Sequence, residues 1–228
     1  AGDGKIGDDT APDGQVKLKA DSRLVLQKDL KLKTLTTDDG SQIDTGDHAL
    51  TVKPAVGLFL NAAVTGVLSL DIPAGFKATL KKDVKGTVRF QAAAGVGSTL
   101  ALDVDVKVTS VDFTAAAVGD TFKLELNKNE IGTLSFAKTT AGLTVKSDGA
   151  ADTENTIHFL QPAADATLEL AGGTRALVVR DGTKGVKWNV KVGNFDTFRV
   201  KSRGLLSGTV KAELANSSIL TLPSGEFP

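Results

Sequence analysis

Residues 100–108 read Leu-Ala-Leu-Asp-Val-Asp-Val-Lys-Val, and this stretch indicates the fold class. A large apolar side chain stands at every second position, and aspartate or lysine stands between most of them. A period of two places successive side chains on opposite sides of an extended strand, so that one side is buried and the other faces water. The same alternation recurs in residues 122–126 and 186–192, and it predicts strands there too.

The composition of the 228 residues favours strands and turns over helices. Aspartate outnumbers glutamate by 21 to 6, and the chain has 25 threonines, 22 valines and 24 glycines. Threonine and valine suit strands, whereas aspartate and glycine suit turns and weaken helices. About twenty alternating runs can be marked, separated by turns such as 38–40, 147–149 and 181–182. We therefore expect an all-β protein with essentially no helix, either a sandwich, a barrel or a β-solenoid.

Two short phrases recur at one spacing and predict an internal repeat. Residues 132–137 resemble residues 166–171, and residues 143–146 resemble residues 177–180 at the same offset. Repeated strand units bury a continuous core by stacking on one another.

Residues 30–52 contain a Leu-Lys-Leu run, an Asp-Asp-Gly turn, an Ile-Asp-Thr-Gly corner and a Leu-Thr-Val run. This order resembles the rungs of right-handed β-helix passengers and of large bacterial adhesins. The resemblance is confined to this one stretch, and evenly repeated rungs of about 20 residues are not visible elsewhere. It implies a secreted or surface-displayed β protein.

The two ends of the chain differ from its middle. Residues 1–14 are rich in glycine and aspartate and hold one large apolar residue, so we expect a flexible arm. Residues 15–222 form the expected β-rich body, with a candidate seam at 149–155. Residues 223–228 form a proline-bounded tail that cannot continue a ladder.

Several classes of function are disfavoured by composition. The chain has no cysteine, methionine or tyrosine, one tryptophan, and two histidines. Disulfide scaffolds, thiolate catalysis and zinc–thiolate sites are excluded, and little is available for acid–base chemistry near neutral pH. The net charge is zero, and the longest basic stretch (Lys81, Lys82 and Lys85) reads as a solvated strand end. We therefore expect no enzyme, no catalytic residue, no nucleic-acid partner and no membrane-spanning helix.

Calcium is the one cofactor that the sequence suggests, and the motifs for it are incomplete. Residues 3–9 resemble half of a calcium loop but lack its leading acidic positions, and Thr10 stands where a glutamate is needed. Residues 2–7 match a dinucleotide fingerprint in letters only, because no strand precedes them. Acidic side chains also crowd one turn, at Asp38, Asp39, Asp44 and Asp47. We expect no bound metal or cofactor at any of these three places.

The remaining polar and aromatic candidates fit a structural role. We expect His48 in a turn and His158 pointing outward from a strand, too far apart for a shared metal. Asp103 and Asp105 should share the wet face of one strand. Ten phenylalanines without tyrosine supply few stacking platforms for sugars, and Trp188 should lie in the core.

The leading hypothesis is a structural, self-assembling subunit of an extracellular filament, pilus-like fibre or surface layer. Strand donation from the N-terminal segment through residues 15–20, or from the C-terminal strand 218–222, would join one copy to the next. The expected partners are copies of the same chain, with host-surface glycans as a further class, and the expected location is the cell surface. The alternatives are a viral capsid decoration or fibre in a virion, and a carbohydrate-binding or β-helical polysaccharide-active protein.

Overall fold

The alternating runs become the strands of a parallel β-solenoid, and the part of the chain that the structure describes has no helix. The structure is a computed structural model that describes residues 14–92, 96–115, 121–137, 143–147, 154–201, 210–214 and 220–221. The predicted all-β class is confirmed, and of the architectures left open the chain adopts the solenoid. The strands are β1 (Gln15–Leu18), β2 (Arg23–Val25), β3 (Leu30–Leu32), β4 (Thr34–Thr37), β5 (Gln42–Val52), β6 (Leu58–Leu60), β7 (Ala63–Ile72), β8 (Lys77–Leu80), β9 (Val84–Ala92), β10 (Val96–Leu102), β11 (Lys107–Phe113), β12 (Thr121–Leu126), β13 (Glu130–Phe136), β14 (Leu143–Ser147), β15 (Glu154–Pro162), β16 (Thr167–Gly182), β17 (Trp188–Val200), β18 (Val210–Leu214) and β19 (Leu220–Thr221).

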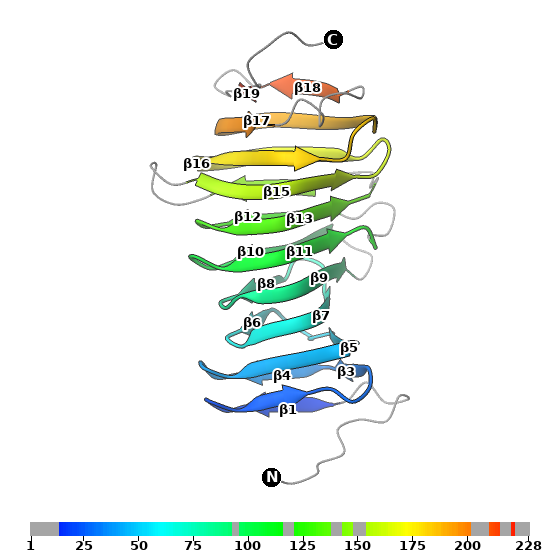
Figure 1. The fold of residues 1–228 in the computed structure, drawn as a ribbon, viewed down its shortest axis with the longest axis vertical. Helices are drawn as coiled ribbons and strands as arrows, with labels where there is room; N and C mark the ends of the chain where they lie inside the picture. Colours follow the sequence, from blue (N-terminus) through cyan, green and yellow to red (C-terminus); the bar gives the residue numbers. More distant parts are fainter. Residues whose placement is uncertain are drawn as a thin grey trace.

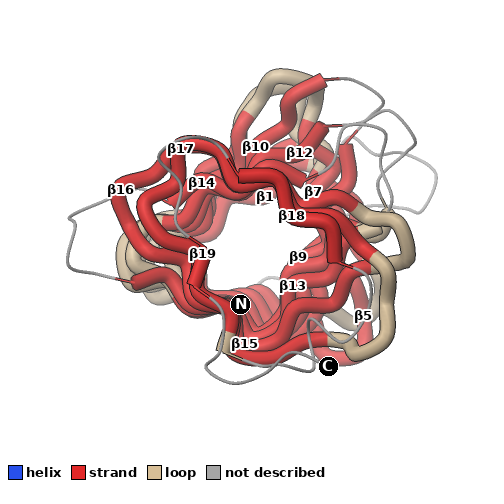
Figure 2. Tube along the Cα trace, turned by 90° about the horizontal axis from the view of Figure 1, so that it is seen from above, coloured by secondary structure: helices blue, strands red, loops and turns tan. Residues whose placement is uncertain are grey.

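The strands stack on three faces around one long axis (Figures 1 and 2). The first face holds β1, β4, β6, β8, β10, β12, β14, β18 and the first halves of β16 and β17; β1 and β4 form a separate two-stranded sheet that contacts β6. The second face begins with β2 and runs through the first residues of the odd-numbered strands β5 to β15. The same long strands bend at a corner and continue into the third face, which begins with β3. All of these pairings are parallel, as expected when one chain winds repeatedly around an axis.

The length of one turn varies along the ladder. Val52 pairs with Leu70, and Leu134 pairs with Leu160, so the second of these turns is the longer one. The stacked strand units that the internal repeat predicted are present as the turns of the solenoid, but the single offset of the two phrases is not the spacing of those turns. Leu168, which that repeat matched to Leu134, lies on the first face and pairs with Leu143, whereas Leu134 lies on the third. The two phrases resemble each other because both are half-buried strands.

The core is a set of stacked apolar columns that fills the inside of the solenoid. On the second face one inward position carries Ile43, Val64, Val84, Val108, Ile131, Ile157, Val179 and Val200. Three rings meet farther along, since Phe113 lies 5.4 Å from Phe90 and 5.5 Å from Phe122 between ring centroids. Trp188 is 1% exposed and packs edge-on against Phe136, so the prediction of a core tryptophan is confirmed.

Two glycines let neighbouring turns approach closely at the corner between the second and third faces. Gly66 and Gly86 are paired in register, and their φ angles are 100° and 156°. A Cβ on Gly86 would lie 1.9 Å from the carbonyl oxygen of Gly66, and a Cβ on Gly66 would lie 2.0 Å from the hydroxyl oxygen of Thr45. No side chain fits at either position, so the sharp bend of β7 and β9 requires glycine.

The stretch 100–108 is not one strand. β10 ends at Leu102, β11 begins at Lys107, and the residues between them form a corner in which Val104 is 52% exposed. Asp105 has a φ of 60°, the left-handed conformation that aspartate tolerates better than most residues. The prediction that Asp103 and Asp105 share one strand is therefore wrong. Likewise the predicted turn at 181–182 is the end of β16.

The ladder continues across the candidate seam, because β14 pairs with β16 and β13 with β15 on either side of it. Both predicted donor segments contain strands of the chain's own solenoid, since β1 pairs with β4 and β19 pairs with β17. The arm as far as residue 13, and the tail, lie outside the described residues.

Candidate functional site

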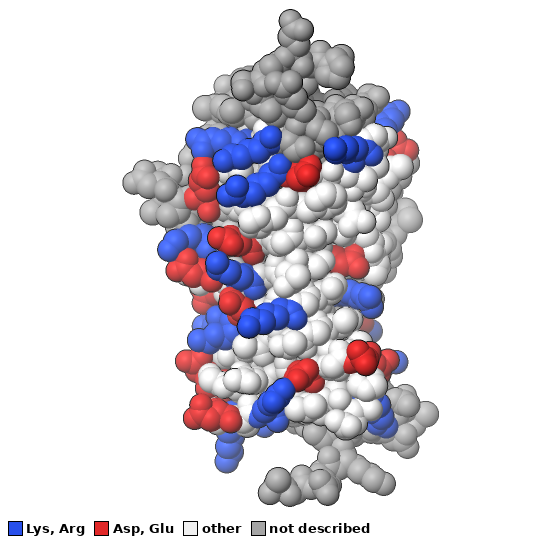
Figure 3. Space-filling model, viewed as in Figure 1, with Lys and Arg blue, Asp and Glu red and all other residues white. Residues whose placement is uncertain are grey.

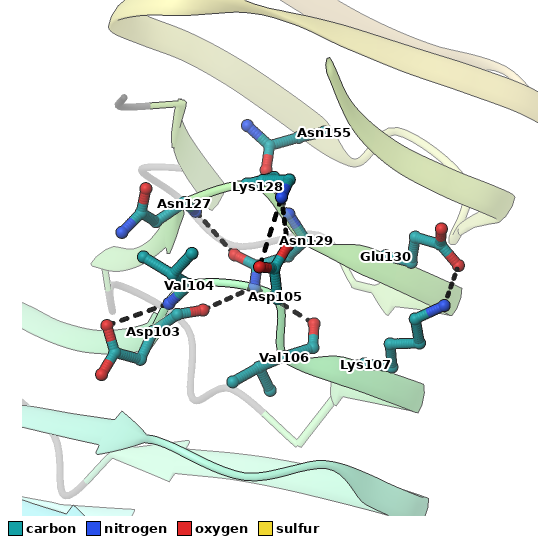
Figure 4. A network of polar contacts seen from close by, with 10 residues as sticks. All are labelled: Asp103, Val104, Asp105, Val106, Lys107, Asn127, Lys128, Asn129, Glu130 and Asn155. Carbon is teal, nitrogen blue, oxygen red and sulfur yellow. Dashed lines mark hydrogen bonds and ion pairs between the residues drawn. The ribbon is translucent and has the colours of Figure 1, made fainter. Parts of the chain in front are cut away.

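A buried asparagine organises the corner between the first and second faces (Figure 4). The side chain of Asn129 donates to the carbonyl oxygens of Asp103 at 2.7 Å and Val106 at 3.1 Å. Its own oxygen accepts the backbone N–H of Asn127 at 2.6 Å, and its backbone N–H donates to the side-chain oxygen of Asn155 at 2.8 Å. Asn129 is 3% exposed and Asn155 is fully buried. The two asparagines thus tie three successive turns together at this corner.

Charged side chains surround this corner on the outside and line an open hollow. Lys128 lies 2.9 Å from a carboxylate oxygen of Asp105, and Lys107 lies 3.4 Å from Glu130, each pair joining neighbouring turns. His158 lies 3.8 Å from the same Glu130. The hollow is lined by Asp105, Lys107, Lys128, Asn129, Glu130, Glu154 and Thr156.

This hollow is electrostatically self-compensated. Asp105, Glu130 and Glu154 each have a cationic side chain as a partner, the last being Arg199. General acid–base catalysis and metal binding both need carboxylates that are free to take a proton or an ion. Among the described residues no group of three or more His, Cys, Asp or Glu could hold a metal. The arrangement is therefore suited to aligning neighbouring turns.

A second hollow on the second face has a similar character. Arg23 donates to Asp44 at 2.6 Å, and the N–H of Gly46 donates to the same carboxylate at 3.1 Å. The Arg23 hydrogen bond, followed by that from Gly46, lowers the pKa of Asp44 below its ordinary value. Ala63, Asp83 and Lys85 also line this hollow. This hollow too is bounded by charges of both signs.

Two ion pairs reach across an intervening strand. Lys77 on β8 lies 2.6 Å from Glu125 on β12, and β10 runs between them. Ala101 on β10 points outward and is nevertheless only 7% exposed. In the same way Arg199 on β17 contacts Glu154 on β15, with Val178 of β16 between them. These pairs shield outward-facing apolar atoms from water.

Exposed aromatic side chains gather near the N-terminal end of the first face, and sequence reasoning missed them. Phe59 is 64% exposed and Phe76 is 41% exposed, with Val56 at 60% nearby in the chain. Lys81 lies 6.0 Å from the centroid of the Phe59 ring. The signal was present: Phe59 stands between Leu58 and Leu60, and a period of two that buries both leucines must point the ring outward.

The remaining predicted site residues are separate or structural. Asp39 pairs with Lys82, whose hydrogen bond and charge lower the pKa of Asp39, whereas Asp44 pairs with Arg23. The acidic turn therefore does not converge on one point. His48 lies within β5, not in a turn, 3.8 Å from Asp29, and His158 points outward from β15 as predicted. The half calcium loop lies outside the described residues.

Comparison with protein-family models, with curated proteins and with solved structures finds no match to this chain. In the described part of the chain no helix combines the length and the apolar character needed to cross a membrane.

Proposed function

We propose that this protein is a structural, self-associating subunit of an extracellular filament, pilus-like fibre or surface layer. The observation that carries the proposal is the unbroken parallel ladder that links successive turns from β2 to β19 around one apolar core. The ladder joins each turn to the turns next to it, so stability accumulates along the axis and the product is a rod. We infer that a rod of this kind serves as a structural subunit. In the hollow at the Asn129 corner each carboxylate is paired with a cationic side chain.

The charges of the rod are compatible with close association between copies. The chain carries 27 basic and 27 acidic residues, and lysines and arginines alternate with carboxylates along the charged margins of the rod (Figure 3). Neutral copies do not repel one another at long range. Between copies, charges of both signs can pair as they pair between turns.

The first strand offers a way for copies to join end to end. The carbonyl oxygens of Gly14 and Leu18 accept hydrogen bonds from the turn that contains β4. The N–H and C=O of one strand residue point to the same side, and alternate residues point to opposite sides. The backbone of Lys17 therefore points away from β4, and among the described strands β1 pairs with β4 alone. Stacking of a second copy on this edge takes the place of the donated strand expected from the sequence.

Electron microscopy and sedimentation of the purified protein test this proposal with a matched pair of variants. Lys17→Pro removes the N–H that points away from β4 and keeps the intramolecular bonds of Gly14 and Leu18, whereas Lys17→Ala keeps that N–H. We expect wild type and Lys17→Ala to form polymers and Lys17→Pro to remain as single rods with an unchanged circular-dichroism spectrum. A wild-type protein that stays monomeric refutes self-association, and Lys17→Pro polymers identical to wild type refute stacking through β1.

A further inference from the structure

We propose that the N-terminal part of the first face binds an anionic polysaccharide. The site is the aromatic–lysine surface, defined here as Lys17, Phe59, Phe76, Lys77 and Lys81. Phe59 supplies the ring on which a sugar stacks, and Lys81 supplies the cation for its sulfate or carboxylate groups. This proposal is independent of polymer formation.

The ring of Phe59 lies outside the apolar core. Its neighbours Leu58 and Leu60 are 4% and 1% exposed, whereas Phe59 is 64% exposed. The core of the described chain uses other phenylalanines, namely Phe90, Phe113, Phe122, Phe136 and Phe198. A large exposed aromatic side chain is the kind of platform that recognition surfaces use.

Lysine and threonine, without a carboxylate, surround this ring on the four strands of the surface. The outward positions of β1, β4, β6 and β8 are Gln15, Lys17, Thr34, Thr36, Phe59, Lys77 and Thr79. Lys81, just after β8, lies against the Phe59 ring. Hydroxyl groups here can exchange hydrogen bonds with sugar hydroxyls, and the lysines can meet negative charge.

Two of the carboxylates near this surface are already occupied. Glu125 pairs with Lys77 and Asp39 pairs with Lys82. Lys17 and Lys81 have no carboxylate partner in the part of the chain that the structure describes. The charge of the surface is therefore complementary to a polyanion.

A sugar polymer can use both the ring and the cations of this surface. An extended chain can lie across the outward side chains of these strands, and the Phe59 ring beside Lys81 offers a stacking position. One ring, a few hydroxyls and a few cations match a repeating sulfated or uronic sugar.

Titration calorimetry at low ionic strength with matched polymers tests the proposal. The probes are dextran sulfate, neutral dextran with the same backbone, inorganic polyphosphate and oligothymidine. We expect the wild type to bind dextran sulfate and not dextran. Phe59→Ala should weaken binding about tenfold through the lost stacking. Lys81→Ala should weaken it several-fold and reduce its salt dependence. Phe59→Trp should retain binding.

The controls lie on other faces of the same rod. Phe159→Ala removes a 36%-exposed ring from β15, and Lys85→Ala removes a cation from the second face; both should bind dextran sulfate like wild type. Polyphosphate binding as tight as dextran sulfate binding overturns the proposal, because it would show that rings are not used. Unchanged affinity in Phe59→Ala, tighter binding of oligothymidine, or no binding of any polymer overturns it equally. Thermal unfolding of each variant shows that the exposed substitutions leave the fold intact.

Discussion

The corner glycines set the closest contact between turns, and they show how single residues limit what the fold accepts. Gly86 lies against backbone atoms of Gly66, which cannot rotate away as the end of a side chain could. Gly75 is a useful contrast, because its φ is 77° but nothing lies within 4 Å of the position of its Cβ. A comparison of Gly86 with Gly75 therefore separates the effect of a close contact between turns from the effect of a positive φ.

Gly86→Ala should lower the free energy of unfolding by more than about 2 kcal/mol, because the added methyl group forces the turns apart and the φ is unfavourable. Gly75→Ala should lower it by only about 1 kcal/mol, from the positive φ alone. Urea unfolding followed by circular dichroism measures both. Equal losses in the two variants would mean that the close approach does not limit the packing of β7 against β9.

At the scale of strands and corners, the asparagine network decides where one strand ends and the next begins. Asn129 satisfies backbone groups of the corner 103–106 that have left the ladder. Buried carbonyl groups without partners cost free energy, so the side chain fixes this corner and, through Asn155, the next turn.

Asn129→Ala should lower the free energy of unfolding by about 2–4 kcal/mol, because several buried groups lose their partners at once. Asn127→Ala is the matched control, since only its backbone N–H takes part in the network, and it should change stability by less than about 0.5 kcal/mol. Thermal unfolding compares the two. A small effect at Asn129 would show that water replaces its hydrogen bonds.

The strands were predictable from alternation, whereas the corners were not. Phe122–Leu126 is a strand because its period of two is matched by one buried side, and local sequence contains that information. Residues 100–108 have the same period, yet Asn129, one turn farther along the chain, draws the backbone of Asp103 and Val106 into a corner. A partner that lies a whole turn away in the sequence leaves no mark on a local pattern.

The same limit applies to the candidate sites, because composition averages over all faces of the rod. Few aromatic residues suggested a poor sugar-binding surface, whereas Phe59 and Phe76 lie on neighbouring turns of the same end. The neutrality of the whole chain likewise gave no sign that Lys17 and Lys81 have no carboxylate partner among the described residues. Register between strands, which sequence did not predict, determines which side chains meet.

At the scale of the whole molecule, the solenoid combines fixed strands with corners of variable length. The turn from Val52 to Leu70 and the longer turn from Leu134 to Leu160 stack in one ladder because the extra residues leave at corners. A loop that grows adds little closure entropy, whereas one residue added within a strand moves every following side chain to the other side of the sheet.

An insertion of about eight Gly and Ser residues after Gly75 should therefore lower the free energy of unfolding by about 1 kcal/mol. One alanine inserted after Leu68, within β7, should lower it by several kcal/mol, because buried Leu70 and Ile72 would turn outward. Urea unfolding and near-ultraviolet spectra measure both. A long insertion at Gly75 that unfolds the protein would show that this corner is part of the core.

The register between turns also bears on how such a chain changes over generations. Leu170 and Val192 are paired on the same face, one turn apart. If the segment between two such residues is removed or duplicated, the strands that become joined still lie on the same face. Recombination at the level of the gene can then lengthen or shorten the rod by one layer of about 4.8 Å without remaking its interior. The length of the molecule is thus open to selection in small, discrete increments.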